Sequence, residues 1–168
     1  LIQSGTGTTT LSGANTYIGA TDIENGQLTV TGTLSDTTAV TVDSGATYDV
    51  ASTDTIGSIA GAGSVALGNG VTLTAGGVNT NTEFSGAMSG QGGYTKAGTG
   101  TTTFSSANTY TGATNINNGK LTVSGSLADT TVLSVASGAT YDVASTDTVG
   151  SIEGAGNITL GSGFVLTA

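Results

Sequence analysis

The stretch Gly5-Thr-Gly-Thr-Thr-Thr-Leu-Ser-Gly-Ala-Asn-Thr-Tyr17 returns later in the chain as Gly98-Thr-Gly-Thr-Thr-Thr-Phe-Ser-Ser-Ala-Asn-Thr-Tyr110. The two copies are offset by 93 residues, and residues 5–75 align with residues 98–168 without a gap. Of these 71 aligned positions, 21 differ. A period of this length is too long for one coil of a solenoid, so a shorter period is expected inside it.

Short apolar triplets supply the shorter period. Leu28-Thr-Val30, Tyr48-Asp-Val50 and Val65-Ala-Leu67 follow one another at similar short intervals along the chain. The 93-residue unit then divides most naturally into about five turns of 18–19 residues, or less naturally into four turns of about 23. Each turn holds two or three short strands, separated by turn-forming pairs such as Asn25-Gly26.

The local composition favours strands over helices throughout. Glycine interrupts every window of about ten residues, and Thr, Val and Ile prefer an extended backbone. Alternation such as Leu28-Thr29-Val30 places aliphatic side chains on one face of a strand and Thr on the other. One turn cannot bury its apolar face alone, whereas a stack of turns can. The pattern therefore predicts an all-β fold, a parallel β-helix (solenoid) of two ~93-residue repeats.

The predicted rod runs through residues 1–168 as one continuous β-helix segment of a longer protein. Residues 5–75 and 98–168 are its repeats, and residues 76–97 form the intervening turns. The alternative is a pair of tandem β-sandwich domains, which the short strands and the lack of a Trp or Cys core pair disfavour. The predicted inward-facing residues are Leu28, Val30, Val42, Val50, Ile59, Leu67 and Leu73, with Leu121, Val123, Val135, Val143, Ile152, Leu160 and Leu166 in the second copy.

The composition excludes several classes of function. The 168 residues include no Cys, His, Pro or Trp, so thiolate chemistry, cysteine metal sites and histidine general bases are absent. Lys96 and Lys120 are the only basic side chains, which argues against a nucleic-acid partner. The net charge of −9 comes from scattered acids and indicates solubility rather than a partner.

A longer motif runs from Phe84 to Val123: Lys-x-Gly-x-Gly, a short strand, Ser-x-x-Asn-Thr-Tyr-Thr-Gly, an Asn-Gly turn and Leu-x-Val. It resembles the autotransporter-associated β-strand repeat, found in passenger domains of type V secreted proteins of Gram-negative bacteria. The first copy, from Ser4 to Val30, matches less fully, because Gln3 stands where Lys96 stands and Ile18 where Thr111 stands.

The resemblance implies a right-handed β-helix that is exported through a β-barrel outside this segment, which would be its one link to a membrane. It also implies an extracellular location at the bacterial cell surface, where many such proteins are adhesins, biofilm components or stalks. The family brings no catalytic, cofactor-binding or metal-binding residue to carry over, and none is assigned.

Paired carboxylates are the first candidate chemistry. Asp49 and Asp54 recur as Asp142 and Asp147, and a feature copied with the fold is more often structural than catalytic, so no enzyme is expected. Calcium could bind weakly at Asp49 with Asp54, or at Asp22 with Glu24, although that second pair becomes Asn115 and Asn117 in the second copy. The simpler interpretation is that these acids lie in turns and face water.

Thr and Tyr side chains are the remaining candidates. Thr-rich strands such as Thr29-x-Thr31-x-Thr33 are typical of ice-binding solenoids, but Asp49 and Ala66 interrupt the row. The Asn15-Thr-Tyr17 and Asn108-Thr-Tyr110 motifs are expected to place Asn in a turn and Tyr at a corner of the coil. The same corner position is expected for Tyr48 and Tyr141.

The sequence therefore predicts a structural stalk or passenger segment of a secreted or surface-displayed bacterial adhesin or extracellular fibre, without catalysis. The alternatives are a binding module whose face recognises glycan or another cell, and an ice-binding solenoid. The copies differ mainly at polar positions, such as Asp22/Asn115 and Gln27/Lys120, which favours a scaffold. The expected partner is the protein itself, through head-to-tail stacking of open coil ends within the parent chain or between copies.

Overall fold

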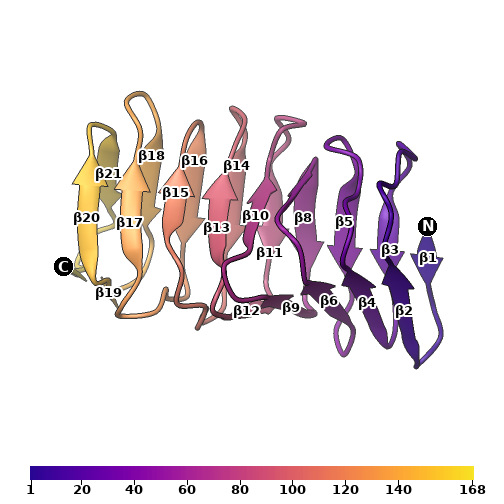
Figure 1. The fold of residues 1–168 in the computed structure, drawn as a ribbon. Coiled ribbons are helices and arrows are strands. Elements are labelled where there is room, and N and C mark those ends of the chain that lie inside the picture. The colour runs from indigo at the N-terminus through magenta and orange to yellow at the C-terminus, as the bar shows by residue number, and fades with distance from the viewer.

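The computed structural model describes all residues, 1–168, and shows a three-sided rod of parallel β-strands with no helix. Strands on the near side of Figure 1 run upward and connect over the top to strands that run down the far side. Because the chain advances from right to left as it makes this rotation, the coil is right-handed, as the family resemblance implied. The fold is thus the predicted right-handed parallel β-helix.

Twenty-two short strands build the three sides. The nine-stranded sheet holds, in spatial order, β1 (Ile2–Gln3), β3 (Thr21–Ile23), β5 (Ala39–Val42), β8 (Ser58–Gly61), β11 (Thr82–Phe84), β14 (Thr101–Phe104), β16 (Lys120–Val123), β18 (Thr140–Val143) and β21 (Asn157–Leu160). The six-stranded sheet holds β7 (Asp54–Ile56), β10 (Thr72–Ala75), β13 (Gly93–Lys96), β15 (Thr114–Ile116), β17 (Val132–Val135) and β20 (Ser151–Gly154).

The third side is shared between two smaller sheets. The five-stranded sheet holds β2 (Thr8–Leu11), β4 (Gln27–Val30), β6 (Thr47–Val50), β9 (Ser64–Leu67) and β12 (Ala87–Gly90), and the two-stranded sheet holds β19 (Asp147–Thr148) and β22 (Leu166–Thr167). Between them, Ala107 and Ser126 form an isolated parallel bridge. The main-chain N–H of Thr109 donates to Met88, and that of Leu127 donates to Asp147, so these segments continue one side.

Every strand pairs with its neighbours in parallel, as the sequence pattern predicted. The coils vary in length: the coil that leads from Thr47 to its partner Ser64 is shorter than the coil that leads from Ser64 to its partner Ala87. Intermediate lengths are the commonest, as from Thr8 to its partner Gln27. Length differences are absorbed at the corners, where glycine and polar residues gather.

The core is one cluster of 31 buried residues that runs from Ile23 to Val149. Alternation along each strand creates it, as in β4, where Leu28 and Val30 are buried and Gln27 and Thr29 are partly exposed. The predicted inward residues of the first copy are all buried: Leu28, Val30, Val42, Val50, Ile59, Leu67 and Leu73. In the second copy Leu121, Val123, Val135 and Val143 are buried, and Ile152 and Leu166 pack partly buried against the core.

Leu160 departs from this prediction, because half of its surface (50%) is exposed. Its register is nevertheless the predicted one, since it pairs with the buried Val143. Leu160 lies in the last coil of the rod, which has no further coil stacked on its outer side (Figure 1). Burial at an inward position therefore needs a neighbouring coil on both sides.

The 93-residue unit does not make a whole number of turns. Each turn has three sides, and successive strands occupy successive sides. Where a side lacks a full strand, an isolated bridge takes its place in the count, as at Ala14–Thr33 and Ala107–Ser126. Counted this way, β1 and its copy β13 lie fourteen sides apart, which is four and two-thirds turns. The unit therefore makes fewer turns than the five expected from the sequence, and each turn is slightly longer than expected.

This phase rotates the second copy relative to the first. Strands β2, β4, β6 and β9 belong to the five-stranded sheet, whereas their copies β14, β16, β18 and β21 belong to the nine-stranded sheet. Equivalent residues of the two units therefore point in directions that differ by one third of a turn. The nine-stranded sheet continues through both units without a break, which rules out tandem sandwich domains.

Candidate functional site

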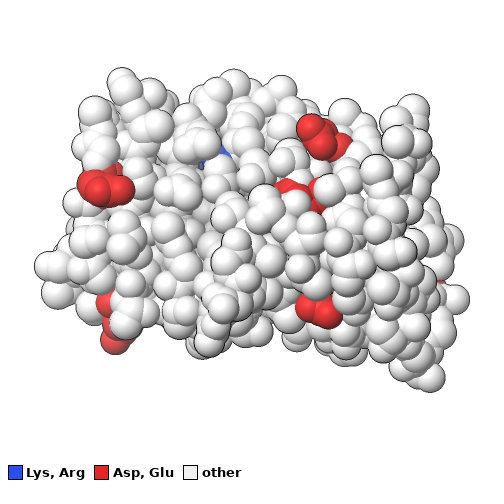
Figure 2. Space-filling model, in the orientation of Figure 1, with Lys and Arg blue, Asp and Glu red and all other residues white.

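The surface of the rod has no pocket, and no group of three or more acidic side chains lies close enough to bind a metal ion. Acidic side chains are spread singly over the face in Figure 2, with almost no basic side chain visible. None of the elements is a helix that could cross a membrane.

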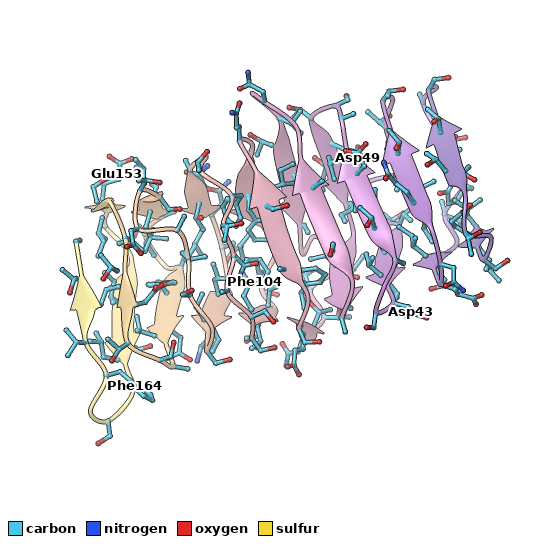
Figure 3. The ribbon with its side chains drawn as sticks, turned by 90° about the horizontal axis from the view of Figure 1, so that it is seen from below. Asp43, Asp49, Phe104, Glu153 and Phe164 are labelled. Carbon is cyan, nitrogen blue, oxygen red and sulfur yellow. The ribbon has the colours of Figure 1, made fainter.

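The carboxylates of Asp49 and Asp54 do not converge. Asp49 points outward from β6, where its Oδ2 accepts hydrogen bonds from Gln27 Nε2 (3.2 Å) and the Thr29 hydroxyl (3.1 Å). Figure 3 shows it on the outside of the rod, as it does Asp43 and Glu153. Asp54 belongs to β7 on another side and is buried. The pair thus lacks the shared groove that two-carboxylate hydrolysis requires.

Asp54 and its copy Asp147 instead tie adjacent coils together. The N–H of Leu34 in the preceding coil donates to Oδ2 of Asp54 (3.0 Å), and that of Leu127 donates to Oδ2 of Asp147 (3.1 Å). Both carboxyl groups are buried, so the expectation that they face water is wrong. Burial raises the pKa of each, although these backbone N–H groups act in the opposite direction.

The raised pKa of Asp54 predicts a specific pH dependence of stability. The folded state holds the proton more tightly than the unfolded state, so this contribution is fully present below the unfolded pKa near 3.8 and is lost as pH rises through the raised value. Asp54→Asn keeps an oxygen acceptor for the Leu34 N–H and removes the titration. We expect the melting temperature of the variant to fall less than that of the parent between about pH 4 and pH 7.

Thermal unfolding followed by circular dichroism over this range measures the difference. The other acids affect both proteins equally, so the comparison isolates Asp54. Asp142 does not interfere. It accepts a hydrogen bond from the Thr159 hydroxyl, which lowers its pKa, so its contribution to stability changes only at more acidic pH. A parent that gains stability relative to the variant as pH rises would show that the pKa of Asp54 is lowered instead.

The Lys-x-Gly-x-Gly motif forms a turn that is held by its own first side chain. Lys96 is fully buried, and its Nζ donates to the carbonyl oxygens of Ala97 and of Gly98 (2.9 Å). Gln3 has the same role in the first copy, where its Nε2 donates to the carbonyl oxygens of Gly5 (2.9 Å) and Gly7 (3.3 Å). Burial lowers the pKa of Lys96. This role explains why Gln can replace Lys here.

The two copies together predict how Lys96 responds to substitution. Lys96→Gln should change the free energy of unfolding by less than about 1 kcal/mol, because Gln3 already holds the same turn through the carbonyl oxygens of Gly5, the counterpart of Gly98, and Gly7. Lys96→Met has similar length but no donor, and it should lose about 1–3 kcal/mol. Urea unfolding of both variants measures the difference. Equal stabilities of the Met and Gln variants would mean that the carbonyl contacts contribute nothing.

The Asn-Gly turn of the next coil stacks directly on this motif. A Cβ added to Gly119 would lie 2.5 Å from the carbonyl oxygens of both Gly98 and Gly100. In the first copy, a Cβ added to Gly26 would lie 2.3 Å from the carbonyl oxygen of Gly7 and 2.4 Å from that of Gly5. Gly26 and Gly119 both have a φ of +64°, which L side chains rarely adopt. Glycine is thus required here for two separate reasons.

The Asn-Thr-Tyr motif bridges three consecutive coils. Asn108 Oδ1 accepts the N–H of Met88 in the preceding coil (2.9 Å), and its Nδ2 donates to the carbonyl oxygen of Ser126 in the following coil (3.3 Å). Tyr110 is buried at the corner, as predicted, and its hydroxyl lies 2.6 Å from that of Thr114. The motif thus acts as a structural clip between coils.

Tyr48 and Tyr141 do not lie at corners, contrary to expectation. They are buried inside strands β6 and β18, because each occupies an inward position in the alternation. The Tyr141 hydroxyl donates to Asp147 (3.3 Å), whereas the Tyr48 hydroxyl has no hydrogen-bond partner in the protein. Phe104, also inside (Figure 3), packs against Tyr94 with ring centroids 4.9 Å apart. These aromatic rings fill the rod.

The Thr-rich rows are interrupted where the sequence predicted. On the outer face of the five-stranded sheet, Thr10 aligns with Thr29, Thr29 with Asp49, and Asp49 with Ala66. A continuous flat array of Thr pairs is therefore absent from this side. Asp22 and Glu24 stand on either side of the buried Ile23, with no third acid beside them.

Sequence reasoning missed the coil-to-coil role of Asp54 and Asp147 and the turn-holding role of Lys96. Their recurrence at the 93-residue offset was the available signal, although Lys96 shares its position with Gln3. The partner of each carboxylate is a main-chain N–H in the preceding coil, which no side-chain pattern reveals. What recurs in both copies is a set of contacts that hold the turns and join adjacent coils.

Comparison with known proteins agrees with these contacts. The family described as passenger-associated-transport-repeat matches residues 1–30 and 95–123, about a third of the chain. The two matched segments correspond to each other under the 93-residue offset, and each contains the Gln3 or Lys96 turn and the Asn-Thr-Tyr clip. No curated protein and no solved structure matches the chain. Two segments of the chain, one in each 93-residue unit, thus match the passenger-associated-transport-repeat, in agreement with the resemblance to autotransporter passenger repeats.

Proposed function

We propose that this β-helix is a structural stalk within the passenger of a secreted or surface-displayed bacterial adhesin or extracellular fibre, and that it performs no catalysis. The rotation between units supports this proposal most directly. Equivalent surfaces of the two units face different directions, so a binding feature present once per unit is not repeated along one face. The apolar core and the contacts between coils, by contrast, hold the rod together whichever way the surface of each unit faces.

The pattern of differences between the copies points the same way. Outward positions exchange charge freely, as at Gln27/Lys120 and Asp43/Ala136, whereas inward positions exchange one apolar side chain for another, as at Val40/Leu133. A stalk needs length and stiffness, which the stacked coils supply through backbone hydrogen bonds and a continuous core. An additional unit should therefore lengthen the rod without changing its fold.

Insertion of a second copy of residues 5–97 after residue 97 tests this. The insert ends with a copy of β13, the strand that precedes residue 98 in the parent, so the order of the sides at the junction is unchanged. Small-angle X-ray scattering should show a rod longer by about 22 Å, from four and two-thirds coils at about 4.8 Å each. A control insert of residues 5–84 lacks two sides and should disrupt the stacking. If the in-phase insert produces a flexible chain or separate globules, the stalk proposal fails.

The competing proposal is a face that recognises glycan. Its test is a glycan array probed with the rod and with a variant in which Asp22 and Glu24 become Asn, as in the second copy. We expect no specific binding by either protein. Saturable binding that the exchange abolishes would favour the binding module over the stalk.

We also propose that coils of this type stack end to end, within the parent chain or between copies. On the outer side of the last coil, Ile158 and Leu160 are exposed (38% and 50%) although they align with the buried Tyr141 and Val143. The pairing of β11 with β14, which joins residues 5–97 to the second unit in the same nine-stranded sheet, supplies a template for such a junction. Backbone hydrogen bonds and apolar contacts would carry it, so salt should affect it little.

Light scattering across protein concentration tests the stacking. The parent should associate as concentration rises, and Leu160→Asp should reduce this association. Ile18→Asp is the control, because Ile18 is apolar and 81% exposed but lies in a corner loop. A rod that stays monomeric at high concentration would refute end-to-end stacking between copies.

A further inference from the structure

Three Asn-Gly pairs lie in turns of the rod: Asn25-Gly26, Asn69-Gly70 and Asn118-Gly119. At such a pair the main-chain nitrogen of glycine can attack Cγ of the asparagine side chain, because glycine has no Cβ to shield it. The side-chain nitrogen leaves as ammonia, and a five-membered succinimide forms. Water then opens either carbonyl and produces aspartate or isoaspartate. The reaction needs only water and a backbone that can rotate into the cyclic geometry.

Two of the pairs are clamped between coils. The carbonyl oxygen of Gly26 accepts the N–H of Thr47 in the next coil (2.9 Å), and that of Gly119 accepts the N–H of Thr140 (2.9 Å). On the opposite side, both glycines abut the carbonyl oxygens of the Gly-x-Gly turns described above. Rotation of either turn would therefore break contacts with the coil before it and the coil after it.

The third pair is not clamped. Asn69 and Gly70 are both exposed, and nothing lies within 4 Å of the Cβ position of Gly70. The turn is closed by the N–H of Val71, which donates to the carbonyl oxygen of Gly68 (3.1 Å). The Gly70 N–H and the Asn69 side chain make no hydrogen bond within the protein. The attacking nitrogen and its target are thus both free to move.

We propose that Asn69 is a site of spontaneous deamidation in the folded rod, whereas Asn25 and Asn118 are protected until the coils separate. The modification adds one negative charge to the turn between β9 and β10, and isoaspartate also adds one atom to the backbone there. The second unit lacks the site, because Ser162-Gly163 occupies the equivalent turn. Gly163 has a similar positive φ of +82° and equally open surroundings. This inference is independent of the proposed stalk function.

The test is incubation of the whole chain in mildly alkaline buffer prepared with ¹⁸O-labelled water, followed by peptide mapping. A protease that cuts after Asp and Glu separates the three pairs, because cleavage sites such as Asp36 and Glu83 lie between them. In the folded chain we expect Asn69 to react at least about tenfold faster than Asn25 and Asn118, because those two require local separation of the coils. In urea the three rates should become similar.

Asn69→Ser is the matched variant, since the second unit already carries serine there. It should leave the melting temperature unchanged and abolish label uptake in the folded state. Equal rates at the three pairs in the folded chain would overturn the proposal. So would a rate at Asn69 that the folded structure suppresses as strongly as it suppresses the rates at the other two.

Discussion

Replacing Val123 with Asp is expected to destabilise the rod by about 3–5 kcal/mol, because it leaves an unpaired charge in an apolar core. Val123 is buried in β16 between Phe104 and Val143, its partners in the coils on either side. Each coil contacts only its neighbours, so the defect should open the stack at this point. Thermal unfolding followed by circular dichroism should show a much lower midpoint than that of the parent.

Asn115→Asp is the control for this substitution. It introduces the same charge in the same unit, but at an outward position of β15, and the first copy already carries Asp22 there. Its midpoint should stay close to that of the parent. If Val123→Asp were as stable as Asn115→Asp, the strand register would be displaced by one residue, since such a shift exchanges the two faces.

Gly119→Ala is expected to have the next largest effect, on the order of 3 kcal/mol from the strained backbone and the displaced coil together. The added methyl group would lie 2.5 Å from two carbonyl oxygens of the Gly98–Gly100 turn, well inside contact distance. The coils can accommodate it only by moving apart, which weakens the hydrogen bonds between them. Urea unfolding should show the loss as a lower midpoint.

Gly138→Ala separates the two causes. Gly138 also has a positive φ, of +85°, but nothing lies within 4 Å of its Cβ position. Its substitution should cost about 1 kcal/mol, from backbone strain alone. The difference between the variants therefore measures the contact between stacked turns. Two equal losses would mean that coil stacking at Gly119 tolerates a side chain.

The rotation between units has a consequence for longer assemblies. Each further unit in the same phase would turn its equivalent surfaces by another third of a turn. Three units would bring a given surface back to its starting direction. A rod of this kind presents its repeated features on all three sides in succession.

Much of the molecule could be predicted from sequence because strand alternation is a local property. The position of Leu28 and Val30 on one face follows from the single residue between them, whatever the coil that covers them. The coil stacking follows from the regular recurrence of the apolar triplets. Val123 and its first-copy counterpart Val30 lie in the core for the same reason.

Contacts between coils could not be predicted in the same way. Asp54 looks like a turn acid in the sequence, and its burial becomes evident only when the N–H of Leu34 is found beside it. The burial of Asp54 depends on which residues of neighbouring coils meet, and the corners between them vary in length. Tyr48 is different, because it stands two residues before the inward-facing Val50 and the local alternation of β6 places its ring inside the rod.

The sequence by itself determined the class of fold, the inward-facing positions and the two-unit repeat, because alternation and turn chemistry act over a few residues. Only the tertiary structure decided the number of turns per unit, the burial of Lys96 and Asp147, and the direction in which each unit faces. The physical reason is that the direction in which a unit faces depends on all fourteen sides that separate it from the unit before. Small differences in corner length, invisible to a local pattern, add up to a third of a turn.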